Sequence, residues 1–393
     1  MDISYPPPLM TSESFARYTV VHRLPSIVVD VIAENEYPPE IVTSLRALCD
    51  EIVNQPIAPL NENAPDVAAW NQAWETFRDR TWLDIPWYFA ESYFYRRLLE
   101  ATGYFQPGNW QGHDPFEVRK RRALEERVAW KVLSERVLAA RFGDERKRFV
   151  TLLHASLWGN RADMSNIALA ARPEDDLGHS LGDNLLIDHT GETWALVASG
   201  RLRRVDFVCD NAGLETLLDL ALAGFLLEKG LCQEIVFHLK TQPFFVSDAM
   251  VKDISPMLAA LRQSGRSTAA LAARLEAYQR DGQWSLQDDP FWTSWLSFRE
   301  MPARTRDELA RSDLVILKGD LNYRRLLDDR CWSPTTRLAD VTGYFPRPFL
   351  TLRTLKAEII VGLQEGQAEA LAAAESDWLV NGRRGLIHLV KDT

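Results

Sequence analysis

The stretch with the most chemical content is SDLVILKGDLNYRRLLDD, which spans residues 312–329. Its apolar run, residues 314–317, is typical of a buried strand, and Gly319 allows a tight turn beneath a ligand. The polar residues that follow at once are Asp320, Asn322, Tyr323, Arg324 and Arg325. Burying carboxylate, amide and guanidinium groups without partners would cost stability. We therefore expect this strand end either to face solvent or to hold a ligand.

Two other short apolar runs lead into polar residues in the same way. RVDFVCD, residues 204–210, ends at Asp210 and is followed by Asn211, with a glutamate shortly after. EIVFHLK, residues 234–240, leads through KTQPFFVSDAM to Asp248. Helix capping explains one Asp, Asn or Ser at such a position, but not an Asp-Asn pair with a nearby Glu. Together the three strand ends predict a rim of oxygen ligands.

These residue types favour a hard divalent cation. Oxygen ligands without a cluster of His or Cys suit Mg²⁺ or Mn²⁺ rather than structural zinc, and such a cation keeps open positions for water or phosphate. Arg324 could clamp an anionic group with its planar guanidinium. Lys356, in LRTLKAE, could neutralise a phosphoryl oxygen. An equal alternative for Lys356 is a helix lysine whose stem covers apolar surface.

Polar residues at several strand ends can meet only if the strands share one sheet. From residue 185 onward, short runs rich in Val, Ile and Phe alternate with helical patterns. The expected strands are residues 204–210, 234–240, 313–319 and 385–390, and the expected helices are 214–230 and 268–284. This alternation is typical of a mostly parallel sheet covered on both faces. Ligands bind such sheets beyond the carboxyl ends of the strands, where these polar residues stand.

The first part of the chain has the pattern of helices. Apolar residues recur at three- and four-residue spacing over residues 38–55, 67–82, 84–105 and 114–149. The basic run in the last of these is interleaved with glutamates, which favours a solvated face over nucleic-acid binding. The sequence thus predicts a helical N-terminal domain, residues 1–150, followed by an α/β domain, residues 151–393.

Composition narrows the class of protein. The 393 residues carry a net charge of −10, which argues against binding nucleic acid through a basic surface. The four cysteines lack CxxC spacing and the N-terminus lacks the features of a signal peptide, so we expect a reduced, cytoplasmic location. The most apolar stretch, residues 217–231, is too short to span a bilayer and is predicted to be a buried helix. We expect no membrane role, and a monomer is the default expectation.

Several common phosphate-binding and nucleophilic motifs are absent. No GxGxxG follows a strand, no GxxxxGK precedes Ser or Thr, and no GxSxG is present. The seven His residues form no pair at metal-ligand spacing. Dinucleotide binding, Walker-type phosphate binding and a serine nucleophile therefore have no support.

The chain resembles the damage-control phosphatases, in particular their sugar-phosphate subfamily with an Arg-Thr-x-Lys signature, through CDNAGLE, VSD, KGDLNYR and RTLKAEIIVGL in that order. The helical part resembles that of the family in RLPSIVVDVI, WYFAESYFYRRLLE, DPFEVRK and LWGNRADMS, so the resemblance covers most of the chain. It implies a Rossmann-like α/β/α three-layer sandwich with an all-helical N-terminal domain. It also implies a metal-dependent phosphatase acting on small phosphorylated metabolites, such as fructose 1-phosphate and related hexose phosphates.

The resemblance also assigns residues. The implied metal ligands, for Mn²⁺, Mg²⁺, Co²⁺ or Ni²⁺, are Asp210, Asn211 and Asp248. The implied substrate contacts are Asp210, Asn211, Asp320, Leu321, Asn322, Tyr323, Arg324 and Lys356. Further pocket candidates are Asn160 and Asp163 of GNRADMS, together with Glu91 and Arg96. Residues 173–189 match no motif of the family, so any specificity element there is undefined.

We hypothesise metal-assisted hydrolysis of a phosphomonoester, in which water or a carboxylate attacks phosphorus and Asp210 and Asp320 are the candidate catalytic residues. One alternative is S-adenosylmethionine-dependent methylation of protein carboxyl groups, described for a related branch of the subfamily. The first strand is followed by DNAGLE and not by a glycine-rich loop that would seat that cofactor. The other alternative is non-catalytic binding of a metal or metabolite, which the complete set of Asp, Asn, Arg and Lys disfavours.

Overall fold

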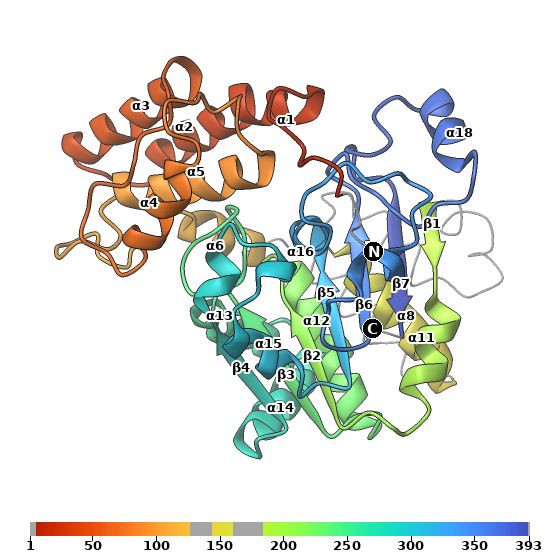
Figure 1. Cartoon of the computed structure of the whole chain (residues 1–393). Coiled ribbons are helices and arrows are strands. Elements are labelled where there is room, and N and C mark those ends of the chain that lie inside the picture. Colours follow the sequence, from red (N-terminus) through yellow and green to blue (C-terminus); the bar gives the residue numbers. More distant parts are fainter. Residues whose placement is uncertain (1–4, 126–143, 160–183, 392–393) are drawn as a thin grey trace.

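The computed structural model describes residues 5–125, 144–159 and 184–391 (Figure 1). A seven-stranded sheet forms the centre of the C-terminal part, with the strand order β1-β7-β6-β5-β2-β3-β4. The strands are β1 (Leu185–Asp188), β2 (Arg204–Val208), β3 (Glu234–Leu239), β4 (Trp284–Asp288), β5 (Leu314–Lys318), β6 (Phe349–Thr354) and β7 (Gly385–Val390). After β2 the chain adds β3 and β4 on one side and then returns to add β5 on the other. The winding direction therefore reverses between β2 and β5.

The prediction of a mostly parallel sheet is confirmed. Strands β2 to β6 run parallel, whereas β7 is antiparallel to β6 and parallel to the edge strand β1. The four predicted strands correspond to β2, β3, β5 and β7, and the pattern missed the other three. β1 and β4 are edge strands in which only one residue each, Ile187 and Trp284, is buried, and β6, FLTLRT, buries Thr and Arg side chains that look like surface residues in the sequence.

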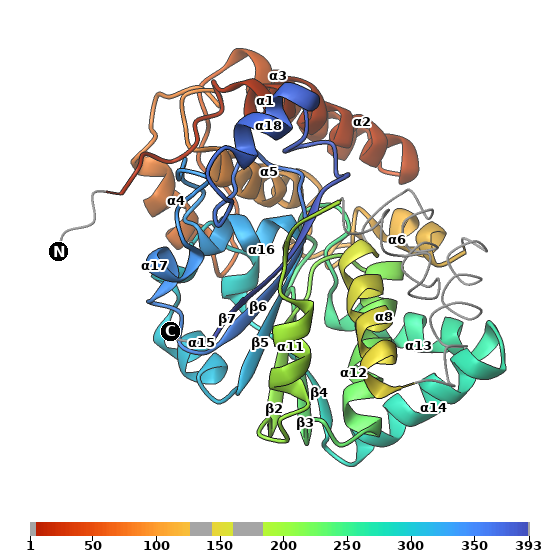
Figure 2. The same cartoon turned by 90° about the vertical axis from the view of Figure 1, so that its right-hand side faces the viewer.

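Helices cover both faces of the sheet, which confirms the predicted three layers (Figure 2). One face carries α8 (Glu145–Trp158), α11 (Thr190–Val197), α12 (Leu214–Glu228), α13 (Val251–Gln263) and α14 (Arg266–Arg280). The other carries α15 (Ala303–Leu309), α16 (Gly319–Leu326) and α17 (Leu338–Thr342), with 3₁₀ turns at Pro290–Thr293 and Phe298–Glu300; α18 (Gln367–Ala374) precedes β7. Phe207 and Ile316 pack in the first core, and Val208 and Leu317 in the second. Because successive residues of a strand face opposite sides, such strands need apolar residues at every position.

The N-terminal part is helical, as predicted. Its helices are α1 (Ser14–Tyr18), a π-helical turn (Thr19–Arg23), α2 (Leu24–Glu34), α3 (Pro39–Asn54), α4 (Val67–Glu75), α5 (Trp87–Ala101) and α6 (Glu117–Glu125). Most of α5 is buried, because it packs on the neighbouring helices and also contacts the α/β part through Trp87 and Glu91. This double burial explains its aromatic-rich sequence. The domain boundary near residue 150 stays a prediction; α8 packs on α12, β6 and β7.

The most apolar stretch of the chain lies in α12, where a buried helix was predicted. Every residue from Glu215 to Leu227 is buried. Within the described ranges, no helix combines the length and the apolar character that a membrane span requires.

The N-terminal segment lies along the α/β part before the first helix. Pro8 and Arg330 form an antiparallel bridge, and the Leu9 backbone N–H donates to the Asp329 carbonyl oxygen at 2.9 Å. The Trp87 N–H in turn donates to the Leu9 carbonyl oxygen at 2.8 Å. The segment therefore links the chain near residue 330 to the start of α5.

Two histidines meet at the β1 edge of the sheet. His388 of β7 packs edge-to-face against His189, with 5.0 Å between the ring centroids. Burial, and then the neighbouring His189, lower the pKa of His388 to about 4. His388 is thus neutral in the native protein over most of the pH range in which an unfolded histidine takes up a proton.

We predict that this histidine makes the fold sensitive to acid. The native pKa is about 4 and the unfolded value is about 6.5, so the unfolded chain binds one extra proton between these limits. The contribution of His388 to the free energy of unfolding is complete above pH ~6.5. It is lost as the pH drops towards ~4, which lowers the free energy of unfolding by up to about 3 kcal/mol. Urea unfolding of wild type and His388→Gln at several pH values checks this. Equal pH slopes in the two proteins would show that His388 has no such role.

Candidate active site

Four parallel strands carry polar side chains to one edge of the sheet. Asp210 follows β2, Asp248 follows β3, Asp320 follows β5 and Lys356 follows β6. These neighbouring strands end where the winding direction reverses, which is where open α/β sheets bind ligands. Beside them lies a pocket of about 370 Å³, the strand-end pocket. Its lining comprises Arg23, Ser26, Ile27, Asp30, Trp87, Glu91, Arg119, Asp210, Asn211, Phe245, Val246, Ser247, Asp248, Asp320, Leu321, Arg324 and Lys356.

The structure brings the three predicted metal ligands together. Asn211 and Asp248 form an isolated backbone bridge, and the Ala249 N–H donates to the Asp210 carbonyl oxygen at 2.8 Å. The Asn211 side chain donates through Nδ2 to Asp210 Oδ2 and to Glu215 Oε2, each at 3.0 Å. The Asn211 amide therefore links the carboxylates of Asp210 and Glu215, while the backbone bridge holds Asp248 next to Asn211.

A turn with unfavourable backbone angles carries Asp248 to this position. Phe245 and Val246 have φ angles of +44° and +64°. The left-handed region is costly for non-glycine residues, and for a β-branched residue above all, and such strain concentrates at functional sites. The turn places Ser247 so that its Oγ donates to Asn211 Oδ1 at 2.5 Å. Strain in the loop is thus coupled to the position of the predicted ligands.

Buried carboxylates crowd at the base of the pocket. Burial, followed by the charges of Glu215 and Asp248, raises the pKa of Asp210 well above its usual range. Burial also raises the pKa of Asp248 to about 6, although Lys240 lies 3.2 Å from Asp248 Oδ2 and opposes the shift. Each negative charge makes the next one less favourable. A bound divalent cation would relieve this repulsion, so the residues present fit a metal ion.

A buried lysine lies beneath these carboxylates. Lys318 Nζ is 3.0 Å from Asp219, 3.6 Å from Glu215 and 2.8 Å from the hydroxyl of Ser156, to which it donates. Burial alone would lower the pKa of Lys318, but Asp219 and Glu215 raise it above its usual value. The lysine therefore stays charged, and it ties α8, α12 and β5 together under the pocket.

The Arg-Thr-x-Lys segment, residues 353–356, is organised around Asp320. Arg353 is fully buried at the end of β6, and its Nε donates to Asp320 Oδ1 at 2.7 Å. The Lys356 backbone N–H donates to the same oxygen at 3.1 Å. Arg353 also donates to the carbonyl oxygens of Ala357 and Ile359. Arg353 thus fixes the turn, and the turn sets the position of Lys356, which lies outside any helix.

Arg324 reaches the strand-end pocket with most of its donors already engaged. Its Nε donates to Asp329 Oδ1 at 2.7 Å, and it forms a second ion pair with Glu91 of α5. The guanidinium lies 3.8 Å from the centre of the Trp87 ring. Burial opposes its charge, but Asp329 and Glu91 keep the pKa of Arg324 above its usual value. The residue joins the two parts of the chain as well as lining the pocket.

Not every predicted residue faces the strand-end pocket. Asn322 is buried and donates to the Lys318 carbonyl oxygen at 2.8 Å, and the Tyr323 ring lies 4.2 Å from the Arg353 guanidinium carbon. Arg96 is paired with Asp66 at 2.7 Å, away from the pocket. Leu321, by contrast, lines the pocket. Asn160 and Asp163 lie outside the described residues, as do residues 173–183.

A second group of carboxylates lies close enough together to hold a metal ion: Asp114, Glu117 and Asp253. Two lysines occupy the space between them. Lys120 Nζ lies 3.0 Å from Asp114 and 2.9 Å from Asp253, and Lys252 Nζ lies 3.1 Å from Asp114. Burial would raise the pKa of Asp114, but the two lysines lower it. The group is therefore better explained as an ion-pair network between α6 and α13.

Sequence reasoning missed several residues of the site. Lys240 and Lys318 each end an apolar strand run, EIVFHLK and DLVILK, and a lysine at that point is a signal that could have been used. Arg23 and Arg119 line the pocket from the helical part. Arg119 is paired with Asp30 and Glu34, whereas Arg23 has no ion-pair partner among the described residues. No local pattern marks these two arginines.

Comparison with known proteins gives the family. The pattern described as the damage-control phosphatase ARMT1-like domain matches residues 19–371. The chain belongs to the damage-control phosphatase family. The relatives named damage-control phosphatase ARMT1 include that of Danio rerio, 35% identical over 95% of this chain and 94% of the relative. That of Homo sapiens is 31% identical over 95% of each chain.

Membership confirms the predicted resemblance, and the damage-control phosphatase family supports a hydrolase that acts on small or damaged metabolites. Among solved structures, a DUF89 family protein from Pyrococcus horikoshii matches with a TM-score of 0.51 and covers 94% of this chain and 97% of its own. Its 14% identity supports the shared fold alone.

We predict that Gly319 is required for the pocket of this phosphatase family member. Its φ is +81°, and a Cβ there would lie 1.9 Å from Asp210 Oδ2. Gly319→Ala should lower the free energy of unfolding by at least about 2 kcal/mol and displace the Asp210 carboxylate. Chemical denaturation measures the loss. Gly366→Ala is the matched control, because its φ is +77° and, apart from its chain neighbours, no described residue has an atom within 4 Å of the added Cβ. Equal losses in the two variants would contradict the prediction.

Proposed function

We propose that this protein is a metal-dependent phosphomonoester hydrolase acting on small sugar phosphates, with hexose phosphates such as fructose 1-phosphate as the substrate class. The observation that supports this most is the placement of Asp210, Asn211 and Asp248 at the ends of adjacent parallel strands, beside Lys356, in one pocket. Two buried carboxylates with raised pKa values, close to a cation, are an arrangement that favours a metal and a phosphate together.

Asp210, Asn211 and Asp248 are the residues that would hold the cation. Oxygen donors of this kind suit Mg²⁺ or Mn²⁺, and Co²⁺ or Ni²⁺ can use the same set. When bound, the ion would supply positive charge that polarises the phosphoryl group and stabilises the transition state. Asn211 Oδ1 accepts a hydrogen bond from Ser247, and a carbonyl oxygen with two lone pairs can accept a second partner.

The chain's own groups would bind and orient the phosphate. Lys356 is close enough to Asp210 to lower its pKa against the effect of burial, so its ammonium group would lie beside the bound phosphoryl oxygens. The first turn of α16, which begins at Gly319, presents backbone N–H groups to the same edge. Arg324 uses three of its nitrogen donors on carboxylates. Arg324 would therefore orient Glu91 and Trp87. It would add positive electrostatic potential to the pocket but would not bind the phosphate through a bidentate contact.

Asp320 would take the proton from an attacking water molecule. Its Oδ1 accepts from Arg353 and from the Lys356 N–H, which fixes the orientation of the carboxylate. Within the described residues, no hydrogen bond reaches its other oxygen, Oδ2. A carboxylate held through one oxygen and open at the other has the geometry of a general base.

The dimensions of the pocket agree with a small sugar phosphate. Its volume of about 370 Å³ is at the small end of ligand pockets. Ser26, Asp30 and Arg119 of the helical part face the strand ends across it. These side chains would bind sugar hydroxyls, while the strand ends hold the phosphate.

We predict that Asp210→Ala abolishes turnover without lowering stability. The uncatalysed reaction is so slow that the site must contribute on the order of 20 kcal/mol, so loss of the central carboxylate should reduce kcat by about a thousandfold or more. Stability of the metal-free protein should not fall, because the repulsion among Asp210, Asp248 and Glu215 is relieved. The measurements are phosphate release from p-nitrophenyl phosphate and a sugar phosphate panel, and thermal unfolding.

The assay begins with metal-stripped protein, to which Mn²⁺, Mg²⁺, Co²⁺ or Ni²⁺ is returned. Activity that requires metal in wild type and vanishes in Asp210→Ala supports the proposal. Full activity in chelator, or an active Asp210→Ala, would contradict it. Metal binding without phosphate release across the panel would favour a binding protein. Binding of S-adenosylmethionine without metal would favour methyl transfer.

We further predict that Lys356 acts on the phosphate through its charge. Lys356→Ala should lower kcat/KM by about a hundredfold, because one cation at the phosphoryl oxygens is lost. Lys356→Arg should restore part of it. The matched control is Lys391→Ala, an exposed lysine remote from the pocket. Equal kinetics for Lys356→Ala and Lys391→Ala would exclude this role.

A further inference from the structure

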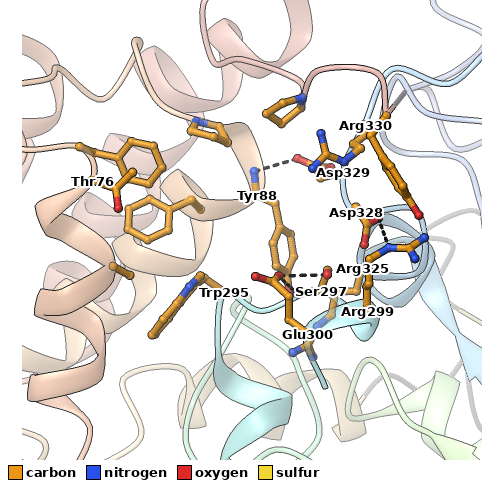
Figure 3. A pocket seen from close by; sticks show the side chains of 16 residues that line it. Thr76, Tyr88, Trp295, Ser297, Arg299, Glu300, Arg325, Asp328, Asp329 and Arg330 are labelled. Atoms are coloured by element: carbon orange, nitrogen blue, oxygen red, sulfur yellow. Dashed lines mark hydrogen bonds and ion pairs between the residues drawn. The ribbon is translucent and has the colours of Figure 1, made fainter. Parts of the chain in front are cut away.

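A second and larger cleft lies between the helical part and the α/β part, on the far side of the Arg324–Asp329 ion pair (Figure 3). Its volume is about 620 Å³, against about 370 Å³ for the strand-end pocket. We call it the aromatic cleft. The residues used below are Phe77, Phe89, Trp295, Arg325, Asp328 and Arg330, all of which line it.

One wall of the aromatic cleft is made of rings. The ring centroids of Phe77 and Phe89 are 4.7 Å apart, and Trp295 lies 4.3 Å from Trp70 behind it. Phe77 and Trp295 are only half-buried, so their faces border open space. In Figure 3, Thr76 and Trp295 lie across the cleft from Arg330 and Asp328. Such a wall favours a planar ring, which gains area and stacking without losing much freedom.

The opposite wall carries two arginines, Arg325 and Arg330, that form no ion pair within the described residues, although carboxylates also line the cleft. Arg325 is fully buried, yet its guanidinium donates to backbone carbonyl oxygens, those of Phe291, Trp292 and Leu296. Arg330 donates to the Pro6 carbonyl oxygen at 2.7 Å, and its Nε is buried and has no hydrogen-bond partner in the described ranges. In the part of the chain that the structure describes, neither arginine has a carboxylate within ion-pair distance. A buried cation without a counter-ion favours an anionic ligand nearby.

The same wall also contains a carboxylate oxygen of Asp328 to which no group donates a hydrogen bond among the described residues. Asp328 Oδ2 accepts from Arg299 Nε at 3.1 Å, but Oδ1 is buried and has no hydrogen-bond partner among the residues that the structure describes. The Asp328 side chain is only 8% exposed. Asp328 and Asp329 have φ angles of +57° and +49°, an unfavourable backbone conformation. An unsatisfied buried carboxylate oxygen on a strained turn would be relieved by an N–H or O–H group of a ligand.

We propose that the aromatic cleft is a second ligand site, which binds a small planar heterocycle carrying both an anionic group and an N–H donor. The ring would lie against Phe77, Phe89 and Trp295. The anion would lie near Arg330, in the field of Arg325, and the N–H would donate to Asp328. This chemistry differs from that of a sugar phosphate, which has hydroxyls and no flat ring.

The two sites share a wall. Asp329 accepts from the Tyr88 backbone N–H on the aromatic side at 2.9 Å and from Arg324 Nε on the other at 2.7 Å. The binding test itself does not depend on any catalytic activity of the strand-end pocket, so failure of the proposed function would leave it intact.

The test uses indole-3-acetate as probe, because it combines a planar ring, an N–H and a carboxylate. Isothermal titration of the full chain should give a Kd of about 1 mM or tighter. Three partial probes lack parts of this set: 1-naphthylacetate lacks the N–H, indole lacks the anion, and acetate lacks both the ring and the N–H. Each should bind about tenfold more weakly or worse.

Variants then locate the site. Trp295→Ala and Arg330→Gln should each weaken indole-3-acetate binding about tenfold. Arg330 is half-buried and outside the apolar cores, so Arg330→Gln gives a result even if Trp295→Ala fails to fold. Trp110→Ala, a half-buried tryptophan elsewhere, and Lys356→Ala in the strand-end pocket should bind as wild type does. No binding at about 5 mM, unchanged binding in both cleft variants, or loss of binding in Lys356→Ala would each overturn the proposal.

Discussion

The interaction on which the rest of the site depends is repulsion among buried carboxylates that the fold holds close together. Asp210, Asp248 and Glu215 are buried at this sheet edge, and burial first, then the neighbouring negative charges, raise the pKa values of Asp210 and Asp248. The backbone bridge between Asn211 and Asp248 prevents separation, and Lys318 and Lys240 offset part of the charge from below. The protein therefore stores electrostatic strain at one sheet edge, in a form that a cation relieves.

Two groups of positively charged residues surround these carboxylates: buried arginines held in ion pairs, and cationic side chains that line the pocket. Arg353 and Arg324 are buried and bound to carboxylates, so they act mainly as fixed connections. Lys356 sits on the turn that Arg353 organises, and Arg23 reaches the pocket from the π-helical turn. The helical part thus contributes residues to the pocket and does not only cover it. Through α5 it supplies the Glu91 partner of Arg324, and the pocket is completed only when both parts are in contact.

Much of the sheet could be predicted because β2, β3 and β5 are buried on both faces and therefore have uninterrupted apolar runs. Their carboxyl ends could be predicted to meet for the same reason, and Asp210, Asp248 and Asp320 do line one pocket. The strand β6 could not be predicted, because its Thr and Arg side chains are buried only through partners distant in the sequence, such as Asp320. Asn322 illustrates the opposite error: it stands among pocket residues in the sequence, but the helical geometry of α16 turns it into the core.

The contact between the N-terminal segment and the chain near residue 330 has a consequence for synthesis. Leu9 pairs with Asp329, and Pro8 with Arg330, so a hydrogen bond of the first few residues spans more than three quarters of the chain. During translation Pro8 and Leu9 leave the ribosome well before their partners, which follow only after most of the sheet has been made. The helices between them can form early from local contacts, while closure of the whole molecule waits for a late event. The segment around Leu9 is thus among the last to reach its native position.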